Sequence, residues 1–228
     1  MKRSEINKAL KELEAMCARE HCYLPPFCNF TPEEWRAKGH EYDEVRDCML
    51  GWDIIDYGLG DFDKVGMSLI TIRNGNRKMA DKYPKVYAEK LLYMKEGQYS
   101  PNHFHWYKTE DIINRGGGNI LIRVYNSLPD ESIDRESDVT VGHTQLPPER
   151  KCGSRRARAS IFSSICITIS RSNPAQGLFC WARSVSAMTT IPTIVLIHRL
   201  DASRRLRKTK HHIACSAMSI QKYKTEEL

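Results

Sequence analysis

Two histidines and a glutamate near the middle of the chain have the types and spacing of metal ligands. His103 and His105 are two residues apart, so a β-strand would point both imidazoles to the same face. Glu110 follows after a short interval, and the next strand could bring its carboxylate over that face. Two neutral imidazoles and a carboxylate bind Mn, Fe, Zn, Ni or Co and leave positions open for water or substrate. The pattern therefore predicts an open metal site.

Glycines on either side of these residues favour a metal site over a chance pairing of histidines. Gly97 can turn the chain into the stretch, and the run Gly116-Gly117-Gly118 can turn it out. A simpler interpretation is a partly exposed strand beside a glycine loop. That interpretation accounts for two histidines on one face, but not for the glutamate and the flanking glycines.

The spacing also carries a resemblance to a known superfamily. Five positions resemble the first cupin motif, complete and in order: Gly97, His103, His105, Glu110 and Gly117. The longer segment 103–118 resembles one cupin family in particular, the D-lyxose isomerases, and residues 1–7 and 51–62 resemble the same family. The resemblance covers about residues 1–141. It implies a mainly β fold, a cupin jelly-roll barrel with N-terminal helices.

The resemblance further implies an aldose–ketose isomerase. It would interconvert D-lyxose and D-xylulose, or D-mannose and D-fructose, with Mn²⁺ as the preferred cation. His103, His105 and Glu110 would hold the cation, which would polarise O1 and O2 of the open-chain sugar while a proton moves between C1 and C2 through an enediol. The base that moves the proton is not identified, and in this family an acidic residue of the C-terminal half is a candidate.

Three further side chains are candidates for contacts with the sugar. Lys108 lies between two proposed ligands, so its ammonium could reach a sugar oxygen as the electrostatic or acid partner; a solvated surface lysine is an equal alternative. Trp106 could wall the sugar pocket, because aromatic faces pack on C–H-rich sugar surfaces, although core packing is as well supported. Lys90 is a candidate substrate contact because it matches a family position.

The first 50 residues predict an N-terminal helical extension. Residues 4–20 place Ile6, Leu10, Leu13 and Cys17 on one helical face, with Ser4 as the expected N-cap. A second helix is expected after Thr31, since threonine, proline and glutamate follow one another in the order of a capped helix start.

Residues 51–143 predict the cupin barrel portion that carries the metal site. The hydrophobic period changes toward two, and strands are expected over 53–57, 65–73, 86–93 and 119–125. Asn74-Gly75 predicts a tight type I′ hairpin turn, because both residues tolerate a positive φ.

Residues 144–228 differ in composition from the rest of the chain. They hold 15 of the 35 basic residues and 4 of the 28 acidic ones, so they carry a net charge of +11 and residues 1–143 carry −4. The Pro-x-Gly-x-x-His context of a second cupin motif is absent from this sequence. Read at face value, the arginine runs are basic patches that could bind phosphate backbones.

A change of reading frame near residues 142–152 is the favoured account of this tail. Codons can be chosen for residues 164–170, 187–195 and 205–210 that give, at one shared offset, a histidine-rich segment and two acidic segments like the family's C-terminal half. A barrel without its closing strands would expose sheet edges and core, so this exact chain is expected to fold poorly and to show little activity.

Composition and length narrow the remaining possibilities. The longest apolar run is too short for a membrane span, the N-terminus does not resemble a secretory signal, and the eight cysteines lack paired Cys-x-x-Cys spacing. These features predict a cytoplasmic protein without a membrane partner. The resemblance implies an enzyme with a small sugar as its partner and a possible homodimer, and nucleic acid is not expected as a partner. Two alternatives stay open: an Fe(II) cupin dioxygenase on the same ligands, and an inactive frameshifted cupin with a basic nucleic-acid-binding tail.

Overall fold

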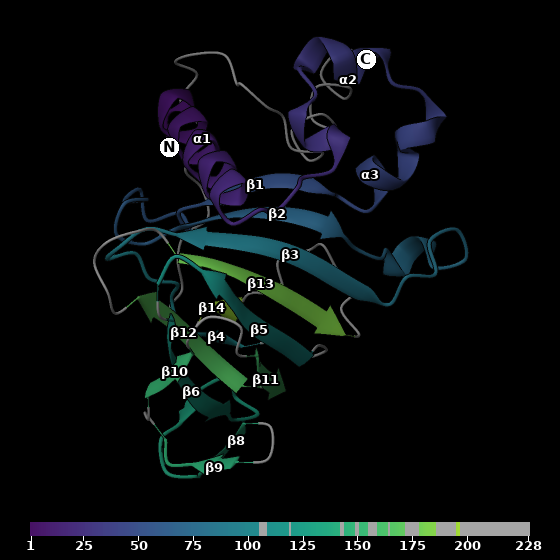
Figure 1. The fold of residues 1–228 in the computed structure, drawn as a ribbon. Coiled ribbons are helices and arrows are strands. Elements are labelled where there is room, and N and C mark those ends of the chain that lie inside the picture. The colour runs from purple at the N-terminus through teal and green to yellow at the C-terminus, as the bar shows by residue number, and fades with distance from the viewer. Residues whose placement is uncertain are drawn as a thin grey trace.

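A computed structural model describes residues 1–104, 109–118, 120–141 and 144–148, and the strand backbone at 151–154, 159–163, 165–171, 178–185 and 195–196. Its body consists of two six-stranded antiparallel sheets (Figure 1). The first contains β1 (Gly51–Ile55), β2 (Met67–Arg73), β3 (Tyr87–Met94), β13 (Leu178–Val185), β5 (Thr109–Gly116) and β11 (Ala159–Ser163), in that spatial order. The second contains β10 (Lys151–Ser154), β6 (Ile120–Ser127), β12 (Ile165–Arg171), β4 (His103–Phe104) and β14 (Val195–Leu196), with β7 (Ile133–Asp134) paired to β6.

The path of the chain confirms the predicted mainly β, cupin jelly-roll class. From β3 to β6 the chain alternates between the two sheets, with β3 and β5 in the first and β4 and β6 in the second. The C-terminal part contributes to both sheets, since β12 pairs with β6, and β13 lies between β3 and β5. A separate small hairpin is formed by β8 (Val139–Val141) and β9 (Thr144–Leu146).

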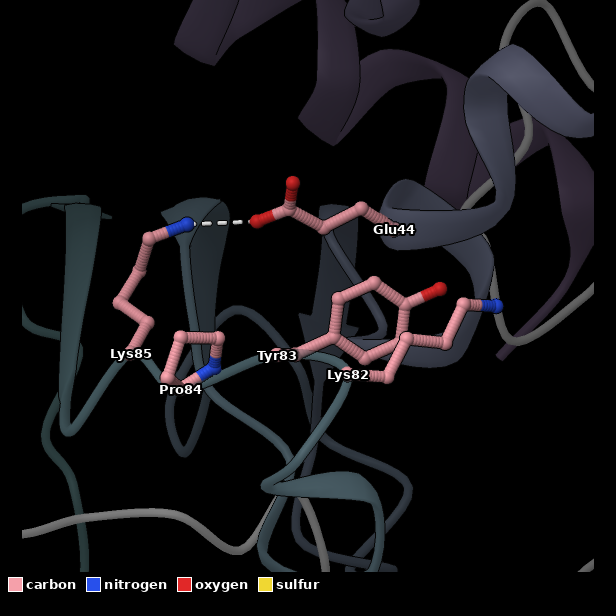
Figure 2. A pocket seen from close by; sticks show the side chains of 5 residues that line it. All are labelled: Glu44, Lys82, Tyr83, Pro84 and Lys85. Carbon is pink, nitrogen blue, oxygen red and sulfur yellow. Dashed lines mark hydrogen bonds and ion pairs between the residues drawn. The ribbon is translucent and has the colours of Figure 1, made fainter.

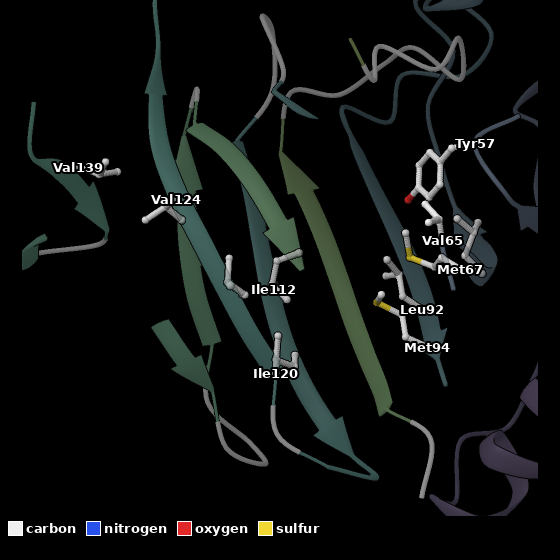
Figure 3. Packing of buried hydrophobic residues seen from close by; sticks show 11 residues of the cluster. Tyr57, Val65, Met67, Leu92, Met94, Ile112, Ile120, Val124 and Val139 are labelled. Atoms are coloured by element: carbon white, nitrogen blue, oxygen red, sulfur yellow. The ribbon is translucent and has the colours of Figure 1, made fainter. Parts of the chain in front are cut away.

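An apolar core fills the space between the two sheets (Figure 3). Met67, Leu92 and Ile112 enter it from the first sheet, and Ile120 and Val124 enter it from β6 of the second. Because side chains alternate across a strand, the residues between these positions lie on the other face of each sheet.

The other face of the first sheet is covered by α1 (Arg3–Arg19). The predicted apolar face is confirmed: Leu10 and Leu13 are buried against Ile70 of β2 and Leu91 of β3. Burying a leucine contributes about 1.5–3 kcal/mol, so this face anchors the helix to the sheet. The predicted cap is wrong, because the helix begins before Ser4 and its N-cap is Lys2, whose backbone N–H donates to the Glu5 carboxylate at 2.6 Å.

A third apolar cluster holds the remaining N-terminal helices together. These are η1 (Pro26–Asn29), α2 (Pro32–Ala37), η2 (His40–Tyr42) and α3 (Asp43–Asp47). Thr31 caps α2 as predicted, since its hydroxyl accepts the Glu34 N–H at 3.2 Å and the Glu34 carboxylate accepts the Thr31 N–H at 2.7 Å. No helix in the described ranges is both long and apolar enough to cross a bilayer.

The end of the predicted strand over 53–57 and the predicted turn at Asn74-Gly75 both differ from the structure. Residues 56 and 57 do not extend β1, because Tyr57 has a φ of +52° and turns the chain away. Asn74-Gly75 does not form a type I′ turn: neither residue has a positive φ, and residues 74–86, including η3 (Arg77–Met79), connect β2 to β3. The Asn74 amide instead donates to the Cys48 carbonyl at 3.0 Å, so tertiary contact overrides the turn preference.

Candidate metal site

His103 begins β4 and is the predicted ligand whose side chain the structure describes. Its backbone pairs with Ile167 of β12 and with Leu196 of β14, so β4 is held on both sides within the second sheet. The side chain is buried, and its Nδ1 lies 2.8 Å from the Pro101 carbonyl oxygen.

This contact fixes the chemistry of the imidazole. A carbonyl oxygen only accepts, so Nδ1 carries the proton in this hydrogen bond and Nε2 then carries the lone pair. Metal-binding histidines in proteins are oriented in this way, with one ring nitrogen donating to a carbonyl and the other facing the cation. The geometry of His103 therefore fits a metal ligand.

The other predicted ligands are described in part. Glu110 lies in β5, the strand after β4, as predicted, and its backbone pairs with Ser184 of β13 and with Phe162 of β11. By the two-residue period of a strand, position 110 shares a face with Ile112, which enters the core between the sheets. The Glu110 side chain, and His105, Trp106 and Lys108 entirely, lie outside the described residues. Among the side chains that are described, no three metal-binding groups come together.

Lys90 lies on the inner face of the first sheet. It is in β3, two residues before Leu92, which is part of the core between the sheets, and its backbone pairs with Thr71 of β2. The neighbouring Leu91 faces α1 instead. The structure thus places this half-buried lysine on the side of the sheet that faces the second sheet.

A carboxylate that no sequence motif indicates shares this face. Asp53 is in β1, between Trp52, which faces α1, and Ile54, which does the same, so Asp53 lies on the inner face. The residue as a whole is exposed to solvent, while many protein atoms lie around its carboxyl group. These atoms partly desolvate the carboxyl and raise its pKa above the ordinary value, and the charge of Lys90 lowers it in part. Only its alternation with Trp52 could have indicated it in advance.

An open pocket elsewhere on the surface carries no reactive group. It is lined by Glu44, Lys82, Tyr83, Pro84 and Lys85 (Figure 2). The Lys85 ammonium is paired with the Glu44 carboxylate at 2.5 Å, and that of Lys82 with the Asp47 carboxylate at 3.2 Å. Both lysine charges are thereby compensated, so the pocket has no excess charge for a ligand.

The described cysteines do not add a nucleophile. Cys17, Cys22, Cys28 and Cys48 are free thiols. Burial raises the pKa of Cys17 and of Cys28 to about 12, so both are protonated and unreactive at neutral pH.

Comparison with known sequences identifies relatives along most of the chain. Residues 1–169 match the family model described as D-lyxose isomerase, so the match continues past residue 141, where the expected resemblance ends. The D-lyxose/D-mannose isomerase of Escherichia coli O157:H7 is 39% identical over 168 residues, which cover 73% of each chain. The protein of the same name from Serratia proteamaculans is 40% identical over 169 residues, 74% of this chain and 73% of its own.

Comparison with solved structures supports the fold. The L-ribose isomerase of Acinetobacter sp. DL28 in complex with L-ribose superimposes with a TM-score of 0.54 at 13% identity, covering 87% of this chain and 86% of the other. Ligand-free L-ribose isomerase of Cellulomonas parahominis gives a TM-score of 0.51 at 15% identity, covering 84% and 86%. At such low identity these likenesses concern the arrangement of strands alone.

Proposed function

Because this chain belongs to the D-lyxose isomerase family, whose members are sugar isomerases, we propose that it interconverts D-lyxose and D-xylulose in a metal-dependent reaction. The two curated relatives are named as D-lyxose/D-mannose isomerases, which supports D-mannose and D-fructose as a second substrate pair. The cation is Mn²⁺ in this proposal, and the enzyme acts in the cytoplasm on a free sugar.

The proposed ligands are His103, His105 and Glu110. When bound, a divalent cation supplies polarisation of the oxygens on C1 and C2 of the open-chain sugar. His103 contributes the Nε2 lone pair, and its Nδ1–H bond to Pro101 keeps that lone pair in a fixed direction. The geometry of this one residue is the observation that carries the proposal.

The remaining candidates act on the sugar itself. Lys90, on the inner face of β3, offers a positive charge to a sugar oxygen. Lys108 is the proposed electrostatic or acid partner of the moving proton, and Trp106 is proposed to wall the pocket. Both remain predictions from the sequence.

Conversion of D-lyxose by purified protein, measured with and without added Mn²⁺, tests this function. We expect product only with the metal, and we expect His103→Ala to abolish it. His40→Ala is the matched control, because the His40 side chain is fully exposed and contacts Asp43 rather than the sheets. Activity that survives His103→Ala would remove the proposal.

Two other functions are measurable with the same preparation. Oxygen uptake with a small-molecule substrate would indicate the Fe(II) dioxygenase, which uses the same types of ligand. Binding to nucleic acid that weakens steeply with salt would indicate a role for the basic tail. Both curated relatives are named as isomerases, so the isomerase is the function we propose.

The frameshift interpretation of residues 144–228 stays a prediction with its own test. The nucleotide sequence across residues 138–155 would show whether an acidic, histidine-bearing frame lies beneath the basic one. If it does, we expect this exact chain to be poorly folded and weakly active, and a chain read in the restored frame to be fully active.

A further inference from the structure

The short segment that leads into the ligand strand is tied to a loop that precedes β2. We call residues 98–103 the ligand segment and residues 56–66 the positioning loop. Gly97, with a φ of +77°, turns the chain out of β3 into the ligand segment, and His103 ends it. The positioning loop connects β1 to β2 at the edge of the first sheet.

Three hydrogen bonds join the two stretches at successive residues of the ligand segment. The Gln98 side-chain amide donates to the Phe62 carbonyl at 2.5 Å. The Tyr99 N–H donates to the Lys64 carbonyl at 3.0 Å. The Ser100 and Tyr57 hydroxyls lie 2.7 Å apart. The ligand segment is therefore anchored immediately before it reaches Pro101 and His103.

Gln98 uses both ends of its amide in this anchor. While its Nε2 group donates to Phe62, its Oε1 accepts the Lys95 N–H at 2.7 Å. The residue is 1% exposed, and Ser100 is fully buried. A buried amide with both groups satisfied has one allowed orientation. Flipping it would place its NH₂ group beside the Lys95 N–H and its oxygen beside the Phe62 carbonyl oxygen, and neither pair can form a hydrogen bond.

The positioning loop is itself held in a constrained conformation. Tyr57 adopts a φ of +52°, a region that bulky residues rarely occupy, and its ring packs beside Val65 and Met67 in the core (Figure 3). A Cβ added at Gly66 would lie 2.6 Å from the Phe62 ring and 2.9 Å from the Ile55 carbonyl oxygen. The loop is thus closed tightly on itself, so that the Phe62 carbonyl faces Gln98 in a fixed place.

We propose that Gln98 is a positioning residue for the metal ligand His103, and that it sets the affinity for the cation without touching it. The inference rests on the proposed function, because it takes His103 as a ligand. The link is direct: the His103 ring is hydrogen-bonded to the Pro101 carbonyl, so the direction of Nε2 follows the backbone of the ligand segment. That backbone is in turn held by Gln98 and the positioning loop.

A purely structural role for Gln98 makes a different prediction. If the amide only contributes to folding, its loss lowers stability and leaves the affinity of the folded protein for metal unchanged. If it positions His103, its loss weakens metal binding beyond what the loss of stability explains. The test therefore needs a variant that loses an equivalent buried amide elsewhere.

Asn74 provides that matched control. It is 2% exposed, and its side-chain amide donates to the carbonyl of Cys48, distant in sequence, as the Gln98 amide donates to that of Phe62. Gln98→Glu and Asn74→Asp each replace the donor group by an oxygen of the same shape. We would measure Mn²⁺ binding to metal-free full-length protein by titration calorimetry at about pH 8, well above the ordinary carboxyl pKa, so that the conditions favour the ionised form of both introduced carboxyls.

We expect Gln98→Glu to weaken Mn²⁺ binding about tenfold, as the loss of groups that support a ligand from outside the coordination sphere does, and Asn74→Asp to leave it unchanged. Equal affinities in the two variants would overturn the inference. Wild-type protein that binds Mn²⁺ but does not convert D-lyxose would reject the proposed function and leave the positioning role intact. Wild-type protein that binds no Mn²⁺ would reject both.

Tyr57→Phe keeps the inference testable if Gln98→Glu does not fold. It removes one hydroxyl from the anchor and leaves the ring in the core, and Tyr83→Phe, which loses a hydroxyl donating to Asp47 at 2.6 Å, is its control. We expect faster hydrogen exchange of the backbone amides at residues 99, 100 and 102–104 in Tyr57→Phe than in Tyr83→Phe, and a roughly two- to threefold weaker affinity for Mn²⁺. Identical exchange at these amides would count against the anchor.

Discussion

The two faces of the first sheet differ in character although the same strands form both. The face toward α1 is apolar, and Leu10 and Leu13 of the helix pack on Ile70 and Leu91 of the sheet. The face toward the second sheet mixes apolar side chains with polar ones, including Asp53, Thr71 and Lys90. One residue of register separates the two environments, because side chains alternate along a strand.

This difference separates the residues that stabilise the molecule from those that can do chemistry. Apolar burial against α1 gains free energy without any need for a charged group. Asp53 and Lys90 on the inner face are partly desolvated, which is unfavourable for stability and useful to an enzyme that must bind and polarise a sugar. Substitutions on the two faces should therefore change different quantities.

Metal removal should have the largest effect, because it would take away the whole polarising charge of the proposed cation. We expect treatment with a chelator to abolish conversion of D-lyxose and added Mn²⁺ to restore it, since the uncharged sugar oxygens then lose their electrophilic partner. The fold should persist, because the apolar core and the α1 interface hold the two sheets. Circular dichroism before and after chelation checks this; full activity in metal-free protein would contradict it.

On the outer face, Leu13→Ala should lower stability and spare the chemistry. Leu13 is completely buried between α1 and the sheet, so its truncation leaves a cavity and is expected to cost about 2–5 kcal/mol in the free energy of unfolding. Urea unfolding measures this loss. The KM of the remaining folded protein should not change. Leu128→Ala, at a leucine that is 39% exposed, should cost far less.

On the inner face, Lys90→Met should lower catalytic efficiency and leave stability nearly unchanged. A charge-assisted hydrogen bond to a sugar oxygen is worth about 1.5–3 kcal/mol, so kcat/KM should fall roughly ten- to hundredfold while the unfolding midpoint stays nearly constant. The neighbouring Glu89 lies on the outer face and is ion-paired with Arg73. Glu89→Gln should change stability by about 0–1 kcal/mol and leave kcat/KM intact. Similar kinetics for the two variants would refute the division between faces.

The elements with strong local signals were predictable from the sequence. The apolar face of α1, the Thr31 cap and the glycine turn at Gly97 follow from spacing and from residue chemistry over a few positions. The turn at Asn74 was not predictable, because a carbonyl of Cys48, distant in sequence, determines how its amide is used. The predicted N-cap is wrong by two residues for a different, local reason: the Glu5 carboxylate accepts a hydrogen bond from the Lys2 N–H, three residues earlier.

The candidate site divides in the same way. Residue type and spacing alone are enough to predict His103, His105 and Glu110 as ligands. The Pro101 contact that orients His103, and the loop that anchors Gln98, depend on how distant segments pack, so no local pattern contains them. Asp53 was not predictable, because a single carboxylate in a strand has no distinguishing spacing.

The smallest effect should come from Asp53→Asn, and its sign tests the character of the inner face. Burial raises the pKa of the Asp53 carboxyl, so the folded protein binds this proton more tightly than the unfolded chain does. Its contribution to stability is therefore most favourable below the ordinary carboxyl pKa and declines as the pH rises through the raised value. Asp53→Asn should flatten that decline and slightly raise the urea midpoint at neutral pH, while kcat falls if the carboxylate serves the reaction.

Asp43→Asn is the control of opposite sign. A hydrogen bond from His40 lowers the pKa of the Asp43 carboxyl, so the loss of this carboxylate should lower the urea midpoint at neutral pH. Midpoints that shift in the same direction in both variants would show that the inner face does not disfavour the charge of Asp53.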